Sequence, residues 1–286
     1  MSEYETDTFE SEDEVYELSR RDVGAVLEAV EAGARDELIS LMEPMHAADI
    51  ADLLEQISSA DRYALIELYG VEFDGEILSE LDESIREDVI SALRPEVLAE
   101  AVRELESDDV VDLLEDLEQL QQDAIFNALD DADAMVARQA LSYPEDSAGR
   151  MMQREVVAAP EHWCVGDVID FMRSSEDLPE QFYHVVLVDP RMHPVGNVTL
   201  GRIMGAPRKQ PLSDLTEEVF QIIPVDQDEG DVAYAFNQYH LISAPVVDDE
   251  GRLVGVITID DAMVVLDEEH EEDILRLAGV GEGSLT

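Results

Sequence analysis

Two sets of acidic residues have a spacing that places their carboxylates together on one face of a helix. Asp108 and Asp112 are four residues apart, and Glu269, Glu272 and Asp273 are separated by three and four residues. Two carboxylates about 4 Å apart repel each other by roughly 4 kcal/mol at an effective dielectric constant near 20. Magnesium prefers carboxylate oxygens, retains several waters and needs only one or two carboxylates at a site. Both sets therefore predict divalent-cation binding.

The acidity of the whole chain gives each of these carboxylates a second explanation. There are 70 Asp and Glu against 17 Lys and Arg, for a formal net charge of −53, and Lys209 is the only lysine. Such a surface attracts cations and repels nucleic acid and anionic lipid. An acidic, lysine-poor surface is also typical of proteins from salt-loving organisms. Because this explanation and a specific cation site are compatible, acidity alone identifies no site.

The sequence contains no arrangement typical of catalysis. The six histidines are scattered without a His-x-x-x-His pair, and Cys164 is the only cysteine, so no zinc site is indicated. A glycine-rich phosphate-binding loop is also missing. We therefore expect that the chain is not an enzyme. No apolar stretch reaches the roughly 20 residues of a membrane span, so we expect the chain itself to be soluble.

Residues 21–143 have the periodicity of short helices. The segment 49–57 recurs at 109–117, sixty residues later, with apolar residues at helical spacing in both copies. Amphipathic helices repeated in this way predict stacked hairpins in an all-α superhelical domain. The acidic residues 1–20 before this region, rich in Ser and Thr, predict a disordered tail.

Residues 144–261 contain a tandem repeat of about 60 residues with α/β character. At an offset of 59, Gly196 falls on Gly255 and Thr199 on Thr258. Each copy predicts a helix, two strands joined by a turn, and a second helix. A final helix is then expected from near Asp261 to about Ala278, with Gly279 as its C-cap.

The α/β repeat resembles a pair of CBS modules, and its second copy carries the resemblance best. There the proline-bearing run 244–247 is similar to the usual second strand, and a strand that contains Gly255 leads into the motif at 258–261. The implied fold class is α plus α/β, in which an all-α superhelical domain is followed by a CBS pair and a connecting helix.

Three further motifs resemble the MgtE family of magnesium channels. Residues 143–152 are similar to the family's junction between its helical domain and its first CBS module. Residues 46–54 resemble its helical-domain signature, with Ala47 where proline is usual, and 272–280 resemble the end of its connecting, or plug, helix. The motifs have the family's order and spacing, so the chain is identified as a member that lacks the membrane pore.

The resemblance also implies domain boundaries. They are a tail at 1–20, a helical domain at 21–143, CBS modules at 144–206 and 207–261, a plug helix at 262–279, and at 280–286 a tail that leads to an absent membrane domain.

The regulatory metal ligands of the family can be carried over residue by residue. With Asp109 included as a neighbour, they fall on Glu76, Asp108, Asp109, Asp112, Asp228, Asp261, Glu269, Glu272 and Asp273. The implied ion is Mg²⁺, with Mn²⁺ or Ca²⁺ as substitutes. Gly230, His240 and Val264 stand where some relatives have acids, so the number of ions stays open.

A nucleotide site is indicated less well. In many CBS proteins a threonine and an aspartate three residues later contact a nucleotide ribose, and Thr258 and Asp261 fit this pattern. In the first copy Thr199 is followed by Arg202, which breaks the pattern, and His184 differs from the family's pocket residue. The broken pattern disfavours ATP or AMP as a ligand.

The function implied by the resemblance is magnesium sensing at the cytoplasmic face of the membrane. The chain would form a homodimer through its CBS modules and would control a pore-forming domain in the same polypeptide or complex. Bound magnesium would hold the acidic surfaces together, and at low magnesium their repulsion would separate them. Two alternatives stay open: a soluble adenine-nucleotide sensor, and an acidic helical-repeat scaffold that binds another protein.

Overall fold

The computed structural model describes residues 20–115, 117, 119–175, 178–179 and 181–267. They form two compact units, each described here by itself. Unit 1 takes the described residues of Met1–Leu105 and Asp116–Asp130, and unit 2 takes those of Glu106–Glu115 and Asp131–Thr286. The predicted tail lies outside the described residues except for Arg20, which is the first residue of a helix.

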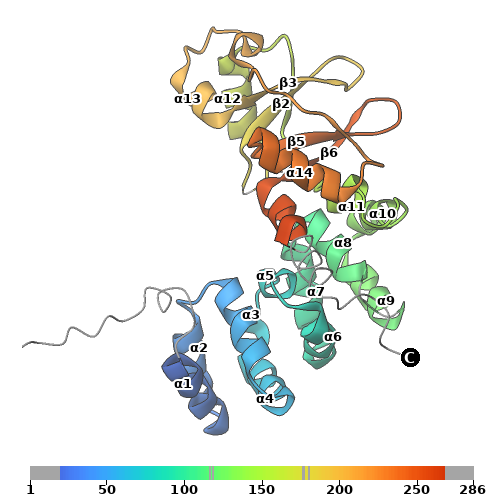
Figure 1. Cartoon of the computed structure of the whole chain (residues 1–286). Coiled ribbons are helices and arrows are strands. Elements are labelled where there is room, and N and C mark those ends of the chain that lie inside the picture. The colour runs from blue at the N-terminus through green and yellow to red at the C-terminus, as the bar shows by residue number, and fades with distance from the viewer. Residues whose placement is uncertain (1–19, 116, 118, 176–177, 180, 268–286) are drawn as a thin grey trace, which may run out of the picture. The chain divides into compact units, whose positions relative to one another are not determined.

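Unit 1 consists of short helices stacked side by side (Figure 1). They are α1 (Arg20–Glu31), α2 (Arg35–Met42), α3 (Ala47–Gln56), α4 (Ser59–Tyr69), the 3-10 helix η2 (Gly70–Glu72), α5 (Glu76–Ser79), α6 (Glu83–Ala92), α7 (Pro95–Glu104) and α9 (Gln119–Ala128). Their apolar faces form the core, in which Leu38, Leu53 and Leu65 are fully buried. The predicted all-α domain is confirmed.

Polar side chains determine where these helices begin. His46 is the N-cap of α3: its Nδ1 accepts a hydrogen bond from the Ala48 amide, and its own amide donates to Asp49 at 3.1 Å. Ser58 caps α4 by accepting from the Asp61 amide at 3.3 Å. Both caps satisfy amides that have no partner within the first helical turn.

Unit 2 contains the predicted α/β repeat. The first copy has β1 (Ala158–Pro160), α12 (Val165–Ser174), β2 (His184–Val188), β3 (Pro194–Thr199), α13 (Leu200–Gly205) and η3 (Leu212–Leu215). The second copy has β4 (Ile223–Pro224), α14 (Glu229–Tyr239), β5 (Ser243–Val247) and β6 (Leu253–Thr258), after which residues 259–267 are helical. Each copy has a three-stranded sheet whose first pair of strands is parallel and whose second pair is antiparallel.

The register of the two sheets confirms the repeat. Leu187 pairs with Gly196 in the first copy, and Val246 pairs with Gly255 in the second, so both partners are shifted by 59 residues. Each copy has its own apolar core. Val185 and Val198 are buried in the first, and Phe236 in the second.

Three further helices belong to unit 2: α8 (Ser107–Glu115), α10 (Asp131–Ala140) and α11 (Ala148–Met151). Helix α8 packs against α10 and α11 through an apolar face on which Val111 and Leu114 are buried. Although α8 lies within the region with helical periodicity, it therefore belongs to the same compact unit as the α/β repeat.

The segment 153–155 joins the start of α8 to β6. Gln153 pairs with Val256 through two backbone hydrogen bonds of 2.9 and 3.0 Å. A Cβ at Gly255 would lie only 2.6 Å from the Gln153 carbonyl oxygen, so this close approach requires glycine. The Gln153 side chain donates to Glu106, and Ser107 Oγ donates to Glu155 at 2.7 Å. These bonds hold the first turn of α8 beside β6.

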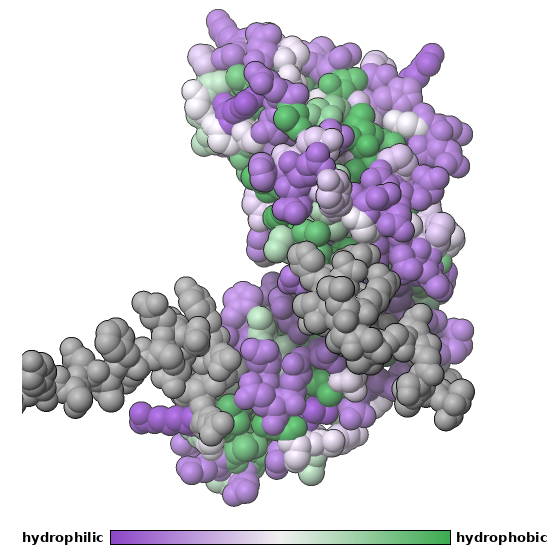
Figure 2. All heavy atoms as spheres, viewed as in Figure 1, coloured by the Kyte–Doolittle hydropathy of each residue, from purple (hydrophilic) through white to green (hydrophobic). Residues whose placement is uncertain are grey.

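The described surface is mostly hydrophilic, as the composition requires, with apolar patches between the polar side chains (Figure 2). Among the described residues there is no helix with both the length and the apolar character needed to cross a membrane.

Candidate metal centre

Two pairs of aspartates meet where α8 and the helix after β6 begin. Asp108 and Asp109 lie in the first turn of α8, and Asp260 and Asp261 follow the last residues of β6. Asp108 is only 8% exposed, and Asp109 and Asp261 are partly buried. We call Glu106, Asp108, Asp109, Asp112, Asp260 and Asp261 the acidic cluster.

Burial makes ionisation of these carboxyls unfavourable. It raises the pKa of Asp108 well above its ordinary value, and the charge of Asp261 raises it further. Burial likewise raises the pKa of Asp109 to about 7, with additional repulsion from Asp261 and Glu106. The charge of Asp261 thus acts on both Asp108 and Asp109, so the end of β6 and the start of α8 lie close together within unit 2.

Asp261 titrates in the same range for a related reason. Burial and then the neighbouring charge of Asp260 raise its pKa to about 7, against the lowering effect of hydrogen bonds from Thr258. The Thr258 amide and hydroxyl approach Asp261 Oδ2 at 3.4 and 2.9 Å, and the hydroxyl also contacts Asp260. The Thr-x-x-Asp motif therefore fixes the Asp261 side chain locally, and its use as a nucleotide contact stays a prediction.

The donor set of the acidic cluster suits a hard divalent cation. All of its side chains offer carboxylate oxygens, which are the ligands that magnesium and calcium prefer. Among the residues that the structure describes, no three acidic or histidine side chains already converge tightly enough to hold an ion. A bound ion would therefore need small side-chain rotations and would keep some of its waters.

The predicted ligands are thus only partly brought together. Asp108, Asp109 and Asp261 lie in the acidic cluster, and exposed Asp112 contributes to the raised pKa of Asp109. Glu76 is exposed at the start of α5 in unit 1, and Asp228 caps α14 by accepting from the Asp231 amide at 3.3 Å. The predicted ligands Glu269, Glu272 and Asp273 lie outside the described residues.

Two members of the acidic cluster, Glu106 and Asp260, were not predicted. Glu106 is two residues before the predicted ligand Asp108, and Asp260 is adjacent to the predicted ligand Asp261. The pair of aspartates after the last predicted strand could have pointed to Asp260. Spacing along a helix could not find Asp260, because it approaches α8 only through tertiary packing.

Comparisons with known proteins give matches over most of the chain. The family model for the MgtE intracellular N domain matches residues 45–146, and the CBS domain model matches residues 212–268. The magnesium transporter MgtE of Thermus thermophilus is 31% identical over 257 residues, which cover 88% of this chain and 57% of that protein. MgtE of Bacillus subtilis is 23% identical over 244 residues, covering 85% and 54%. The chain spans little more than half the length of these relatives.

Solved structures agree with these matches. The cytosolic domain of the Mg²⁺ channel MgtE in complex with ATP has a TM-score of 0.77 at 28% identity, covering 85% of this chain and 99% of that one. The soluble part of a magnesium transporter has a TM-score of 0.74 at 25% identity, covering 87% and 98%. As the motifs predicted, the chain belongs to the MgtE family and comprises its helical N domain and its pair of CBS modules.

Proposed function

We propose that this chain is the magnesium-sensing regulatory region of a magnesium-transport protein and acts at the cytoplasmic face of the membrane. The observation that carries the proposal is the burial of Asp108, Asp109 and Asp261 beside one another, with raised pKa values. Near neutral pH such carboxyls either keep a proton or need a cation. A divalent ion offsets several of these charges at once.

The residues present fit magnesium. Asp108, Asp109 and Asp261 would hold the ion, with Asp112 and Asp260 close enough to add to its attraction. The ion supplies positive charge, and the chain supplies oxygen donors from two separate elements, α8 and the helix after β6. Mn²⁺ and Ca²⁺, which bind the same donors, are expected to substitute for it.

Chain connectivity suggests how binding would be transmitted. Helix α8 packs in unit 2, but the chain on both sides of it, through Leu105 and from Asp116, belongs to unit 1. An ion at the start of α8 would therefore act on a helix of unit 2 that the chain of unit 1 enters and leaves. Asp261 also lies in the first turn of helix 259–267, which leads into the predicted plug helix. We propose that magnesium-dependent changes at these two points gate a pore-forming domain.

We expect saturable magnesium binding that depends on the acidic cluster and not on acidity in general. In molar potassium chloride, which screens exposed charges, calorimetry should show at least about tenfold weaker binding for Asp108→Asn/Asp112→Asn. The matched control is Glu161→Gln/Asp249→Asn, which removes two exposed acids elsewhere in unit 2 and should bind like the parent. Equal weakening by both double variants would refute a specific site.

We further propose that the chain forms a homodimer through its CBS modules. Tyr234, Met204 and Val264 are 62%, 71% and 60% exposed, so an interface that covers them would remove apolar surface from water. Light scattering at millimolar magnesium should give a mass near twice 31.8 kDa. Tyr234→Glu/Val264→Glu should shift the protein toward the monomer. A monomer at every protein and magnesium concentration would contradict this proposal.

Nucleotide sensing is a second candidate function, because one similar solved structure is described as a complex with ATP. In this chain the Thr258 hydroxyl donates to Asp261, which belongs to the acidic cluster. A triphosphate at that point would meet several carboxylates, so ion sensing is the better-supported function.

A further inference from the structure

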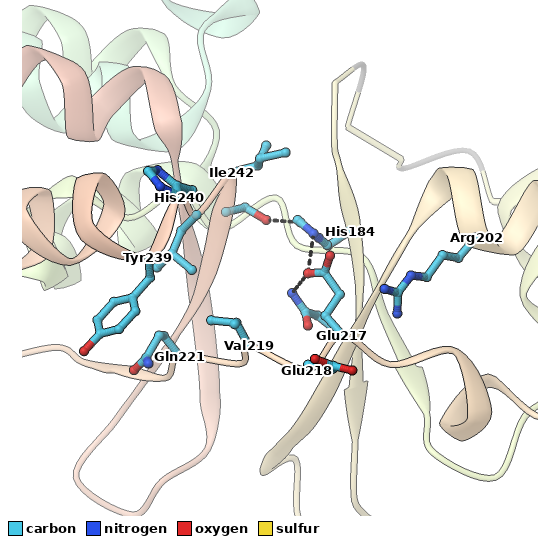
Figure 3. Close-up of a pocket in the computed structure, with 12 residues that line it drawn as sticks. His184, Arg202, Glu217, Glu218, Val219, Gln221, Tyr239, His240 and Ile242 are labelled. Atoms are coloured by element: carbon cyan, nitrogen blue, oxygen red, sulfur yellow. Dashed lines mark hydrogen bonds and ion pairs between the residues drawn. The ribbon is translucent and has the colours of Figure 1, made fainter.

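A cavity of about 300 Å³ lies between the two copies of the α/β repeat in unit 2 (Figure 3). Both copies contribute to it. His184 and Asn197 come from β2 and β3, Ser243 comes from β5, and residues 217–219 of the connection between the copies form another wall. None of these residues belongs to the acidic cluster.

The floor of the cavity is a network of buried polar side chains. His184 bonds to Ser243 Oγ through Nδ1 at 2.6 Å and to Glu217 Oε2 through Nε2 at 3.1 Å. Asn197 Nδ2 donates to the same Glu217 oxygen at 3.1 Å. His184, Asn197 and Ser243 are only 7%, 5% and 8% exposed. The Glu217 carboxylate is therefore held in place by two buried donors.

One acceptor in this floor has no hydrogen-bond partner among the residues that the structure describes. Asn197 Oδ1 is buried and makes no hydrogen bond. Turning the amide over would not help, because the oxygen would then face the Glu217 carboxylate. A buried acceptor without a donor is costly, and Asn197 lines the cavity. An occupant of the cavity, whether water or a ligand, would supply this donor once the Asn197 side chain turned slightly toward it.

The charges around the cavity select the class of occupant. Glu217 and Glu218 face one guanidinium, that of Arg202, which already donates to the carbonyls of Leu215 and Thr216 at 2.9 and 2.7 Å. Burial lowers the pKa of His184, against the opposing effect of Glu217, so its imidazole is neutral near pH 7. In a chain of net charge −53, these carboxylates favour a cation and oppose a polyphosphate.

We propose that this cavity binds a small organic cation of the amine or guanidine class rather than a nucleoside triphosphate. Its N–H groups donate to Asn197 Oδ1 and to the carboxylates of Glu217 and Glu218. Its hydrocarbon part lies against Tyr239 and Ile242, which line the same cavity and are 46% and 45% exposed. The inference does not depend on magnesium sensing, since the two sites share no residue.

Agmatine, which carries both a guanidinium and an amine, is a suitable probe. Calorimetry on the full chain, in molar potassium chloride with millimolar magnesium present, should show one saturable site per chain. Glu218→Gln removes an exposed carboxylate and should weaken binding about tenfold. Ile242→Trp fills the cavity mouth and should abolish binding. Glu161→Gln, an exposed acid outside the cavity, should leave affinity unchanged.

Several results would overturn the proposal. One is the absence of saturable agmatine binding, and another is equal weakening by Glu218→Gln and Glu161→Gln, which would indicate nonspecific attraction to an acidic surface. A third is ATP binding that is tighter than agmatine binding and is lost in Ile242→Trp. Circular dichroism checks that the Ile242→Trp variant folds. If that variant does not fold, the affinity of Glu218→Gln for agmatine tests the proposal on its own.

Discussion

When divalent ions are removed by chelation, the free energy of unfolding should fall as the pH rises from about 6 to about 8. The pKa values of Asp109 and Asp261 are about 7 in the folded protein, against 3.8 for an ordinary aspartate. In this range the folded state holds more protons than the unfolded state, so raising the pH favours unfolding. The contribution of these two carboxyls to the free energy of unfolding is fully present below pH 3.8 and is lost as the pH rises through 7.

The expected loss between pH 6 and pH 8 is on the order of 1 kcal/mol for each of the two carboxyls. Because they repel each other, the two losses will not simply add. Urea unfolding at several pH values measures the slope.

Magnesium should remove this pH dependence and should release protons as it binds, since it competes with them for the same oxygens. Calorimetric titrations at pH 6.5 in MES and in imidazole, buffers with different ionisation enthalpies, report the number of protons released. Asp109→Asn/Asp261→Asn should have a clearly shallower stability profile between pH 6 and 8, with the remaining slope assigned to buried Asp108, whose pKa is also raised. An unchanged slope in that variant would assign the effect to other groups.

The single substitution Asp109→Asn should stabilise the magnesium-free protein while weakening its response to magnesium. At pH 8 the wild-type chain must keep a partly buried carboxylate ionised, and an amide of similar shape avoids that cost. We expect a gain on the order of 2 kcal/mol, which corresponds to about 5 °C in melting temperature for a unit of this size.

Saturating magnesium should then raise the melting temperature of the wild-type chain by several degrees and that of Asp109→Asn by much less. Scanning calorimetry with and without magnesium tests both signs in one experiment. Glu161→Gln, an exposed acid in the same unit, is the matched control and should behave like wild type in both conditions. Destabilisation of the magnesium-free Asp109→Asn protein would mean that this carboxylate makes a structural bond that the amide cannot replace.

The sequence predicted the elements well because each of them is encoded locally. The offset of 59 that relates Gly196 to Gly255 reappears in the register of both sheets. The helical spacing around Asp108 correctly placed it on a helix. Family motifs supplied the order of the domains, which the comparisons support.

Helical spacing was less informative about the metal centre. It paired Asp108 with Asp112, whereas the structure buries Asp108 beside Asp109 and Asp261 and leaves Asp112 exposed. The contact with Asp261 depends on the segment 153–155, which holds α8 beside β6 across about 150 residues of chain. A contact of that range depends on packing, and no periodicity in either segment encodes it. The ligands at 269–273 are outside the described residues and stay a prediction.

The bond between His184 and Ser243 has a consequence for the history of the fold. The two residues are 59 positions apart, the offset that relates the two sheets, so they occupy the same place in the two copies and bond to each other. An ancestor assembled from two identical modules would have brought two identical side chains together there. In this chain one half of the position is an imidazole that bonds to both Ser243 and Glu217, and the other half is a hydroxyl. That asymmetry gives the pseudosymmetric pair a single polar cavity with a defined direction.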